Sequence, residues 1–107
     1  MDKMDSLEYK IYQYLCKNHL GKKNLIKNRE LREIFDVSGD KKMRKIIQNI
    51  REDKNFPMLV GSISGKRGGY YICITEKEKK ETINNTRRRA NQMLKACHIM
   101  EWKAKMS

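Results

Sequence analysis

Apolar residues recur at helical spacing near the start of the chain and predict an amphipathic helix over residues 6–19. The apolar positions of this helix are Leu7, Ile11, Tyr14 and Leu15. Asp5 and Glu8 have the spacing of a capping box, and Ser6 is the rival N-cap. Gly21 and the polar run "GKKN" end the helix. The apolar pair "LI" that follows has the length of a brief strand.

Two further helices are predicted on either side of the break "DVSGD". The first is the short segment "RELREIF", which Asn28 can cap. Its inward-facing residues are Leu31, Ile34 and Phe35. The second begins at a cap on Ser38 and runs to Asp53, and "NFP" stops it because the residue before a proline is disfavoured in the α region. The apolar set of this third helix is Met43, Ile46, Ile47 and Ile50.

The last third of the chain combines a hairpin signal with a long helical pattern. The β-rich runs "MLVGSI" and "YYICIT" are joined by "SGKRGG", which predicts a hairpin with a longer loop than the tight two-residue kind. Thr75 and Glu78 form a second capping box, after which the chain can be helical almost to its end. A stripe of positions spaced three and four apart suits a partner helix. The stripe consists of Ile83, Thr86, Ala90, Met93, Cys97, Met100 and Ala104.

The charge of the chain points to a polyanionic partner. It carries 25 Lys and Arg against 13 Asp and Glu, a net charge of +12 and a pI near 9.8. The excess is +2 over residues 1–39, +5 over 40–74 and +5 over 75–107. So much positive charge resists compaction unless a polyanion relieves it. Nucleic acid is the first candidate, and an anionic membrane or an acidic protein surface comes second.

Cysteine usage and hydropathy narrow the class of protein. Cys16, Cys73 and Cys97 are an odd number without a CxxC pair. The sequence has neither an apolar leader nor a run of 18 apolar residues. These features predict a reduced, soluble, cytoplasmic protein that does not insert into a membrane.

The order of elements carries a resemblance to a known fold. The segments "NRELREIFDVSGDKKMRKIIQNIRED" and "GGYYI" contain a helix, a turn, a longer helix and the far strand of a hairpin. Over residues 6–75 this order resembles a winged helix-turn-helix domain, and it is similar to small DNA-binding proteins of bacteriophages and mobile elements, including the DNA-binding domain of phage replication-initiation proteins. The resemblance implies an α+β, mainly α fold of three helices plus a β-hairpin wing, followed by a long C-terminal helix. The domains would be residues 1–75 and a helical extension over 76–107. The implied role is DNA binding in transcription regulation or DNA replication, in the cytoplasm of a bacterial host.

The third helix has a polar face opposite its isoleucines. Turning 100° per residue, the face holds cations and amides suited to guanine, adenine or phosphate in the major groove. Its candidate DNA-binding residues are Lys41, Lys42, Arg44, Lys45, Gln48 and Asn49. The alternative is an ordinary solvated helix face.

The hairpin tip puts Lys66 and Arg67 between glycines, although a turn that only reverses the chain needs no cation. In a winged helix this tip would contact a phosphate or enter the minor groove, and the glycines would permit close approach and positive φ. The alternative is a solubilising loop tip. Tyr70 and Tyr71 have alternating faces, so at least one is expected in the core.

The last helix carries Arg87, Arg88 and Arg89, and two of the three can follow a phosphate backbone. The candidate nucleic-acid-binding residues here are Arg87 and Arg88. A solvated helix face is the equal alternative. The helix can pack on its own domain or form a homodimer with a second copy, and its length favours the homodimer. Trp102 also needs a partner surface.

The same residues also suit functions other than DNA binding. The alternative to a DNA-binding protein is a winged helix that binds and inhibits or redirects a host protein, and RNA binding uses the same charges. Cys16 and His19 with Cys97 and His98 are a poor zinc set, because adjacent helical residues diverge by about 100°. "GKRGG" lacks the phosphate-loop spacing, and no catalytic grouping stands out. The sequence therefore predicts no cofactor, no metal and no enzyme activity.

Overall fold

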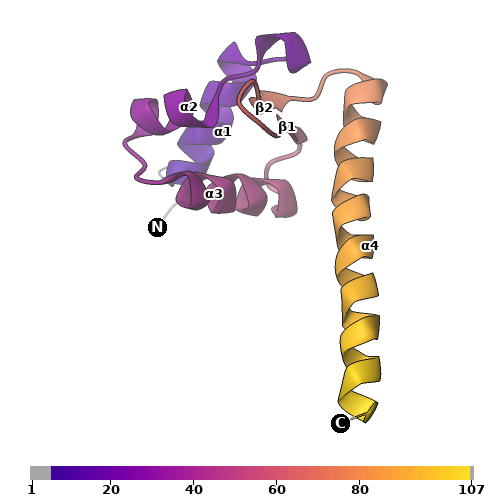
Figure 1. The fold of residues 1–107 in the computed structure, drawn as a ribbon. Coiled ribbons are helices and arrows are strands. Elements are labelled where there is room, and N and C mark those ends of the chain that lie inside the picture. Colours follow the sequence, from indigo (N-terminus) through magenta and orange to yellow (C-terminus); the bar gives the residue numbers. More distant parts are fainter. Residues whose placement is uncertain (1–5, 107) are drawn as a thin grey trace.

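The elements of the chain form an α+β, mainly helical structure in a computed structural model, which describes residues 6–106. Four α-helices and one antiparallel hairpin follow one another within that range (Figure 1). They are α1 (Leu7–Asn18), the 3-10 turn η2 (Lys22–Asn24), α2 (Asn28–Phe35), α3 (Asp40–Glu52), β1 (Val60–Ile63), β2 (Gly69–Ile72) and α4 (Glu76–Met106). The coarse fold class predicted from the sequence is confirmed.

Helix α1 begins where its side-chain cap predicts. The Ser6 hydroxyl accepts a hydrogen bond from the Tyr9 backbone N–H at 3.1 Å, whereas Asp5, the other predicted partner, lies outside the described residues. The residues that α1 buries are Ile11, Tyr12 and Leu15. Tyr14 packs at the edge of the core, edge-on to Phe35.

Helices α2 and α3 form at the predicted places, but neither has the predicted cap. Asn28 is the first residue of α2 rather than its N-cap, and its amide donates to the Tyr70 hydroxyl at 2.8 Å. Gly39, with φ 92, holds the N-cap position of α3, so Ser38 does not cap that helix. Glycine takes this backbone conformation without a steric cost.

The inward set of α2 is also corrected. Leu31 is fully buried, but Ile34 is 50% exposed and Phe35 is half-buried. A helix of eight residues has little more than two turns, so only one apolar position faces the core directly. In α3, by contrast, the whole predicted apolar set is buried: Met43, Ile46, Ile47 and Ile50.

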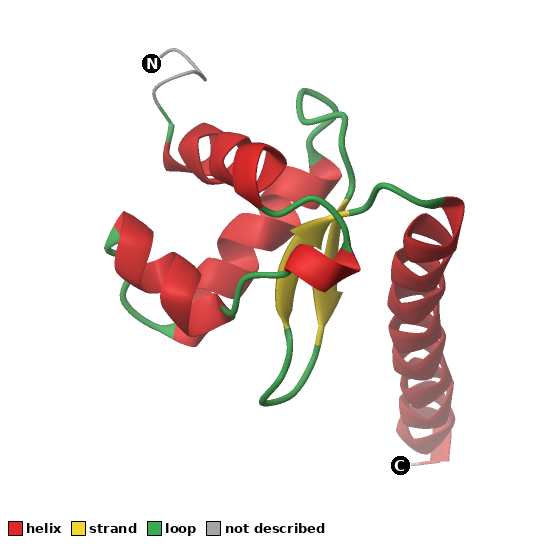
Figure 2. Cartoon of the chain, turned by 90° about the horizontal axis from the view of Figure 1, so that it is seen from above, coloured by secondary structure: helices red, strands yellow, loops and turns green. Residues whose placement is uncertain are grey.

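The two strands pair antiparallel from Val60 with Ile72 to Ile63 with Gly69. The "LI" step contributes a single bridge residue, because Ile26 pairs with Tyr70 through hydrogen bonds of 2.8 and 2.9 Å. The hairpin lies between the cluster of α1, α2 and α3 and the separate α4 (Figure 2). One hydrophobic core therefore joins the helices to the inner side of the hairpin.

Helix α4 starts at the predicted capping box. The Glu78 N–H donates to Thr75 Oγ1 at 3.1 Å, and the Thr75 N–H donates to Glu78 Oε1 at 3.4 Å. Thr82 is the buried residue of this 31-residue helix, and every side chain from Ile83 to Met106 is exposed. The helix thus packs on β1 near its start and then runs past α3 into solvent (Figure 1). Within residues 6–106 no helix is both long enough and apolar enough to cross a bilayer.

Candidate nucleic-acid interface

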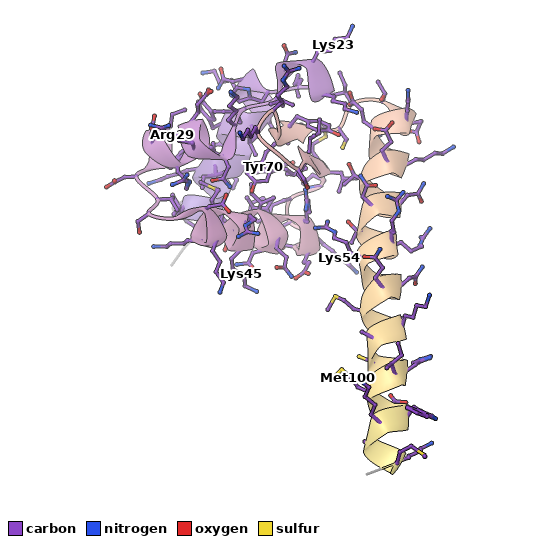
Figure 3. All side chains as sticks on the ribbon, in the orientation of Figure 1. Lys23, Arg29, Lys45, Lys54, Tyr70 and Met100 are labelled. Carbon is purple, nitrogen blue, oxygen red and sulfur yellow. The ribbon has the colours of Figure 1, made fainter. Side chains whose placement is uncertain are left out.

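Helix α3 presents its cations to solvent because its apolar residues are taken up by the core. Lys41, Lys42, Arg44, Lys45 and Gln48 are all exposed. Figure 3 shows Lys45 pointing away from the globular part of the molecule. Helix α4 packs on β1 and leaves this face of α3 uncovered.

Part of this face is engaged in local pairs. Arg44 Nε lies 2.9 Å from Asp40 Oδ2, and Gln48 Nε2 donates to Glu52 Oε1 at 3.2 Å. Exposed pairs four residues apart contribute about 0.3–0.5 kcal/mol each, so a ligand can replace them at little cost. Among the described residues, Lys41, Lys42 and Lys45 form no ion pair.

Asn49 lies apart from the other predicted site residues. It is half-buried, and its amide donates to Glu8 Oε1 on α1 at 3.1 Å. The residue therefore links two helices of the core. The polar face that remains for a ligand is narrower than the sequence predicts, and its cations lie toward the N-terminal end of α3.

The hairpin tip carries Lys66 and Arg67 into solvent, as predicted. Gly65, with φ 98, makes the bend in this loop. Gly68 and Gly69 have another purpose, because a Cβ on them would collide with the carbonyls of Ile63 and Ile26 respectively. These two glycines serve close packing of the chain on itself rather than approach to a ligand.

Both tyrosines of the far strand are buried. Tyr70 and Tyr71 are 6% and 2% exposed, and the Tyr70 hydroxyl accepts a hydrogen bond from Asn28. Burial raises the pKa of both phenols. Neither ring is available to stack on a base.

A basic groove lies between the hairpin and α4, and its lining residues are far apart in the sequence. Its volume is about 420 Å³, and its cations are Lys22, Arg51, Arg88 and Arg89. Arg51 Nε donates to the Val60 carbonyl at 2.7 Å, which fixes the guanidinium at the end of α3. Two features of the sequence point to these residues: the arginine triplet of α4, and Arg51 at the end of the buried apolar stripe of α3. Only the tertiary fold brings the two features together.

The arginine triplet divides between two sides of α4. Arg89 borders the groove, Arg87 borders a shallow polar hollow on the outer side, and Arg88 lies between them and borders both. Two residues along a helix are about 160° apart, so this division follows from helix geometry. Of the predicted pair Arg87 and Arg88, one borders the groove and one does not.

The described part of the chain has no cluster of metal ligands and no activated thiol among Cys16 and Cys73. Within residues 6–106 no three His, Cys, Asp or Glu side chains gather closely enough to hold a metal ion. The His19 ring contacts the Asn24 carbonyl through Nδ1 at 2.7 Å. Burial raises the pKa of the Cys16 and Cys73 thiols, which disfavours the reactive thiolate.

Scans against family models, curated proteins and solved structures found no match to this chain.

Proposed function

We propose that the chain is a DNA-binding protein of winged helix-turn-helix type, with α3 as the recognition helix and the β1–β2 hairpin as the wing. The observation that carries the proposal is the uncovered cationic face of α3, opposite four buried apolar residues of the same helix. The Ile26–Tyr70 bridge and the turn between α2 and α3 support the same fold type.

Affinity would come mainly from phosphate neutralisation. Lys41, Lys42 and Lys45 lie in the N-terminal half of α3, the part of a recognition helix that meets base edges and flanking phosphates. Gln48 lies one turn further along and can read adenine once it leaves Glu52. Lys66 and Arg67 at the hairpin tip would contact a flanking phosphate or the minor groove.

The biological role proposed with this activity is that of a regulator of transcription or a replication accessory of a phage or mobile element, in the cytoplasm of a bacterial host. A homodimer through α4 would present two copies of α3 to two half-sites. Selection of bound sequences from random DNA would test this directly, since a dimer selects a palindrome.

Charge changes on α3 test the DNA-binding proposal. Lys41→Glu with Lys45→Glu is expected to abolish specific binding in a gel-shift series. The milder pair Lys41→Gln with Lys45→Gln should lower the slope of log affinity against log salt by about 2, because each lost phosphate contact removes about 0.9 from the slope. The matched control is Lys10→Glu with Lys17→Glu, which makes the same charge change on exposed positions of α1. Parent-like binding by the α3 variants would refute this reading face.

A second candidate function, docking on a host protein, is favoured by one observation. Trp102 and Ile99 are 62% and 51% exposed, and they lie on the side of α4 away from Met93 and Met100, so an α4–α4 dimer would not cover them. Co-purification of a stoichiometric host protein, together with no DNA shift at low salt, would favour this candidate.

A further inference from the structure

The basic groove between the hairpin and α4 holds like charges against each other. Burial lowers the pKa of the Arg51 guanidinium, and the positive charge of Arg89 lowers it further. Two guanidinium groups that repel each other favour a state in which an anion lies between them. Unlike the α3 face, this is a concave site built from four separate parts of the chain.

The described residues supply little negative charge to offset these cations. Glu81 is the acidic residue that lines the groove, and its Oε2 already lies 3.4 Å from Lys22 Nζ. Arg51 Nη2 is buried and has no hydrogen-bond partner among the described residues. A buried donor without an acceptor costs about 1–3 kcal/mol, and more when it is charged.

Neutral donors complete the lining. The hydroxyls of Ser62 and Ser64 and the amide of Asn85 border the groove, and each can donate a hydrogen bond to an oxyanion. The volume of about 420 Å³ exceeds what a single small ion needs and falls within the range of small-molecule sites. The chemistry of the lining, guanidinium groups with hydroxyls and an amide, is the chemistry that recognises phosphate.

We propose that this groove binds the phosphoryl group of a nucleotide or nucleic acid, between Arg51 and Arg89. The site is separate from the face of α3 and does not depend on DNA recognition by that helix. The phosphoryl group can belong to a free ligand or to a nucleic-acid backbone. Such a backbone would leave the groove at Ser64 and follow the hairpin loop toward Lys66.

Titration with inorganic pyrophosphate at constant ionic strength tests the site, with thermal unfolding and calorimetry as readouts. Pyrophosphate should raise the unfolding temperature of the parent chain saturably. Arg89→Gln should weaken the affinity about tenfold or more, since it removes a charge-assisted hydrogen bond. Arg87→Gln is the matched control, with the same charge change two positions away on the outer side of α4, and it should bind as the parent does.

Folding is checked in the same experiment. Without anion, Arg89→Gln should unfold at a slightly higher temperature than the parent, because it relieves the repulsion on Arg51. Equal pyrophosphate affinity in the parent and both variants, or no saturable effect at all, would overturn the proposed site.

The source of the phosphoryl group is decided by DNA binding. If Arg89→Gln also weakens DNA binding and pyrophosphate competes with DNA, the groove takes a backbone phosphate. If DNA binding is unchanged while pyrophosphate binding is lost, the ligand is a free phosphate compound. The Lys41→Glu with Lys45→Glu variant should still bind pyrophosphate, so failure of the α3 proposal remains distinguishable from failure of this one.

Discussion

Gly69 shows how a single residue sets the packing of the hairpin. Ile26 and Tyr70 exchange two backbone hydrogen bonds, and a Cβ at position 69 would collide with the Ile26 carbonyl. Gly69→Ala should therefore destabilise the fold by about 1–3 kcal/mol, the usual cost of overpacking a site that cannot relax. Urea denaturation measures the loss.

The control for Gly69→Ala is Lys66→Ala, at an exposed position of the same loop. It should leave the unfolding midpoint unchanged within error, since exposed substitutions away from special features usually shift stability by less than about 0.5 kcal/mol. Equal urea midpoints for Gly69→Ala and the parent would show that the backbone at Ile26 moves to accommodate the extra methyl group.

Residues whose environment is set by their own helix period were predicted well. The apolar set of α3 is buried as the period requires, and the lysines opposite it are exposed. The errors at Ile34 and Ser38 and the unpredicted contact of Asn49 share a cause, since each depends on a neighbour that the sequence does not place. Ile34 has no element over it, Gly39 displaces Ser38 as cap, and Asn49 meets Glu8 from a distant helix.

At the scale of elements, Glu78 joins the start of α4 to the rest of the fold. Its Oε1 accepts from the N–H groups of Ile74 and Thr75, and its Oε2 accepts from the Lys22 N–H at 2.9 Å. The hydrogen bonds from the Ile74 and Lys22 N–H groups lower the pKa of this carboxyl below its ordinary value. The sequence predicted the capping box but not the bond to Lys22, which depends on where η2 lies.

The lowered pKa of Glu78 gives a dependence of stability on pH with a defined sign. Folding stabilises the ionised form of this carboxyl. The resulting stabilisation of the fold is present above the unfolded pKa and is lost as pH falls through the folded pKa. Glu78→Gln should lower the unfolding midpoint at pH 7 and reduce the further loss below about pH 4.3, the ordinary value for a glutamate. Urea denaturation from pH 7 to pH 3 measures both effects.

Glu76→Gln provides the matched control in the same turn of α4. Glu76 is exposed, and its hydrogen-bond partner is Lys79 at 3.5 Å, so this substitution should reproduce neither the drop at pH 7 nor the change in the acid limb. An acid limb that is the same for Glu78→Gln and the parent would show that other carboxylates dominate acid unfolding.

For the whole molecule, the order and type of the elements were readable from the sequence, but their meeting points were not. Helical and strand periods, two caps and one hairpin loop are local signals, and they locate α1, α3, the hairpin and α4. The basic groove is assembled from η2, α3, the β1–β2 hairpin and α4, which are far apart in the chain. No local pattern brings Arg51 and Arg89 together, so a site of this kind becomes visible only once the fold is known.

The exposed distal part of α4 is the feature of the whole molecule that most needs a partner. Met93 and Met100 are 69% and 65% exposed on the stripe, and Figure 3 shows Met100 far from the globular part. Isolated helices are marginal in water even at favourable composition, so this segment gains from packing. In an antiparallel pair of α4 helices with residue 95 at the centre, Ala90 would face Met100 of the second copy and Met93 would face Cys97, which fits large residues against small ones.

This pairing predicts a dimer of twice the 12.8 kDa chain mass, measured by light scattering after size exclusion. Met93→Lys with Met100→Lys should make it monomeric, with a dissociation constant at least about a hundredfold higher, because each buried methionine contributes about 1.5–3 kcal/mol. Ile99→Lys with Met106→Lys is the control, since it adds the same charge about 120° away on the helix and should leave the dimer intact.

Oxidation separates the antiparallel from the parallel orientation of the two α4 helices. A parallel pair would bring Cys97 against Cys97 of the second copy and form a disulfide-linked dimer, whereas the antiparallel pair would not. A parent chain that is monomeric at high concentration would rule out both orientations and leave the stripe to a different protein.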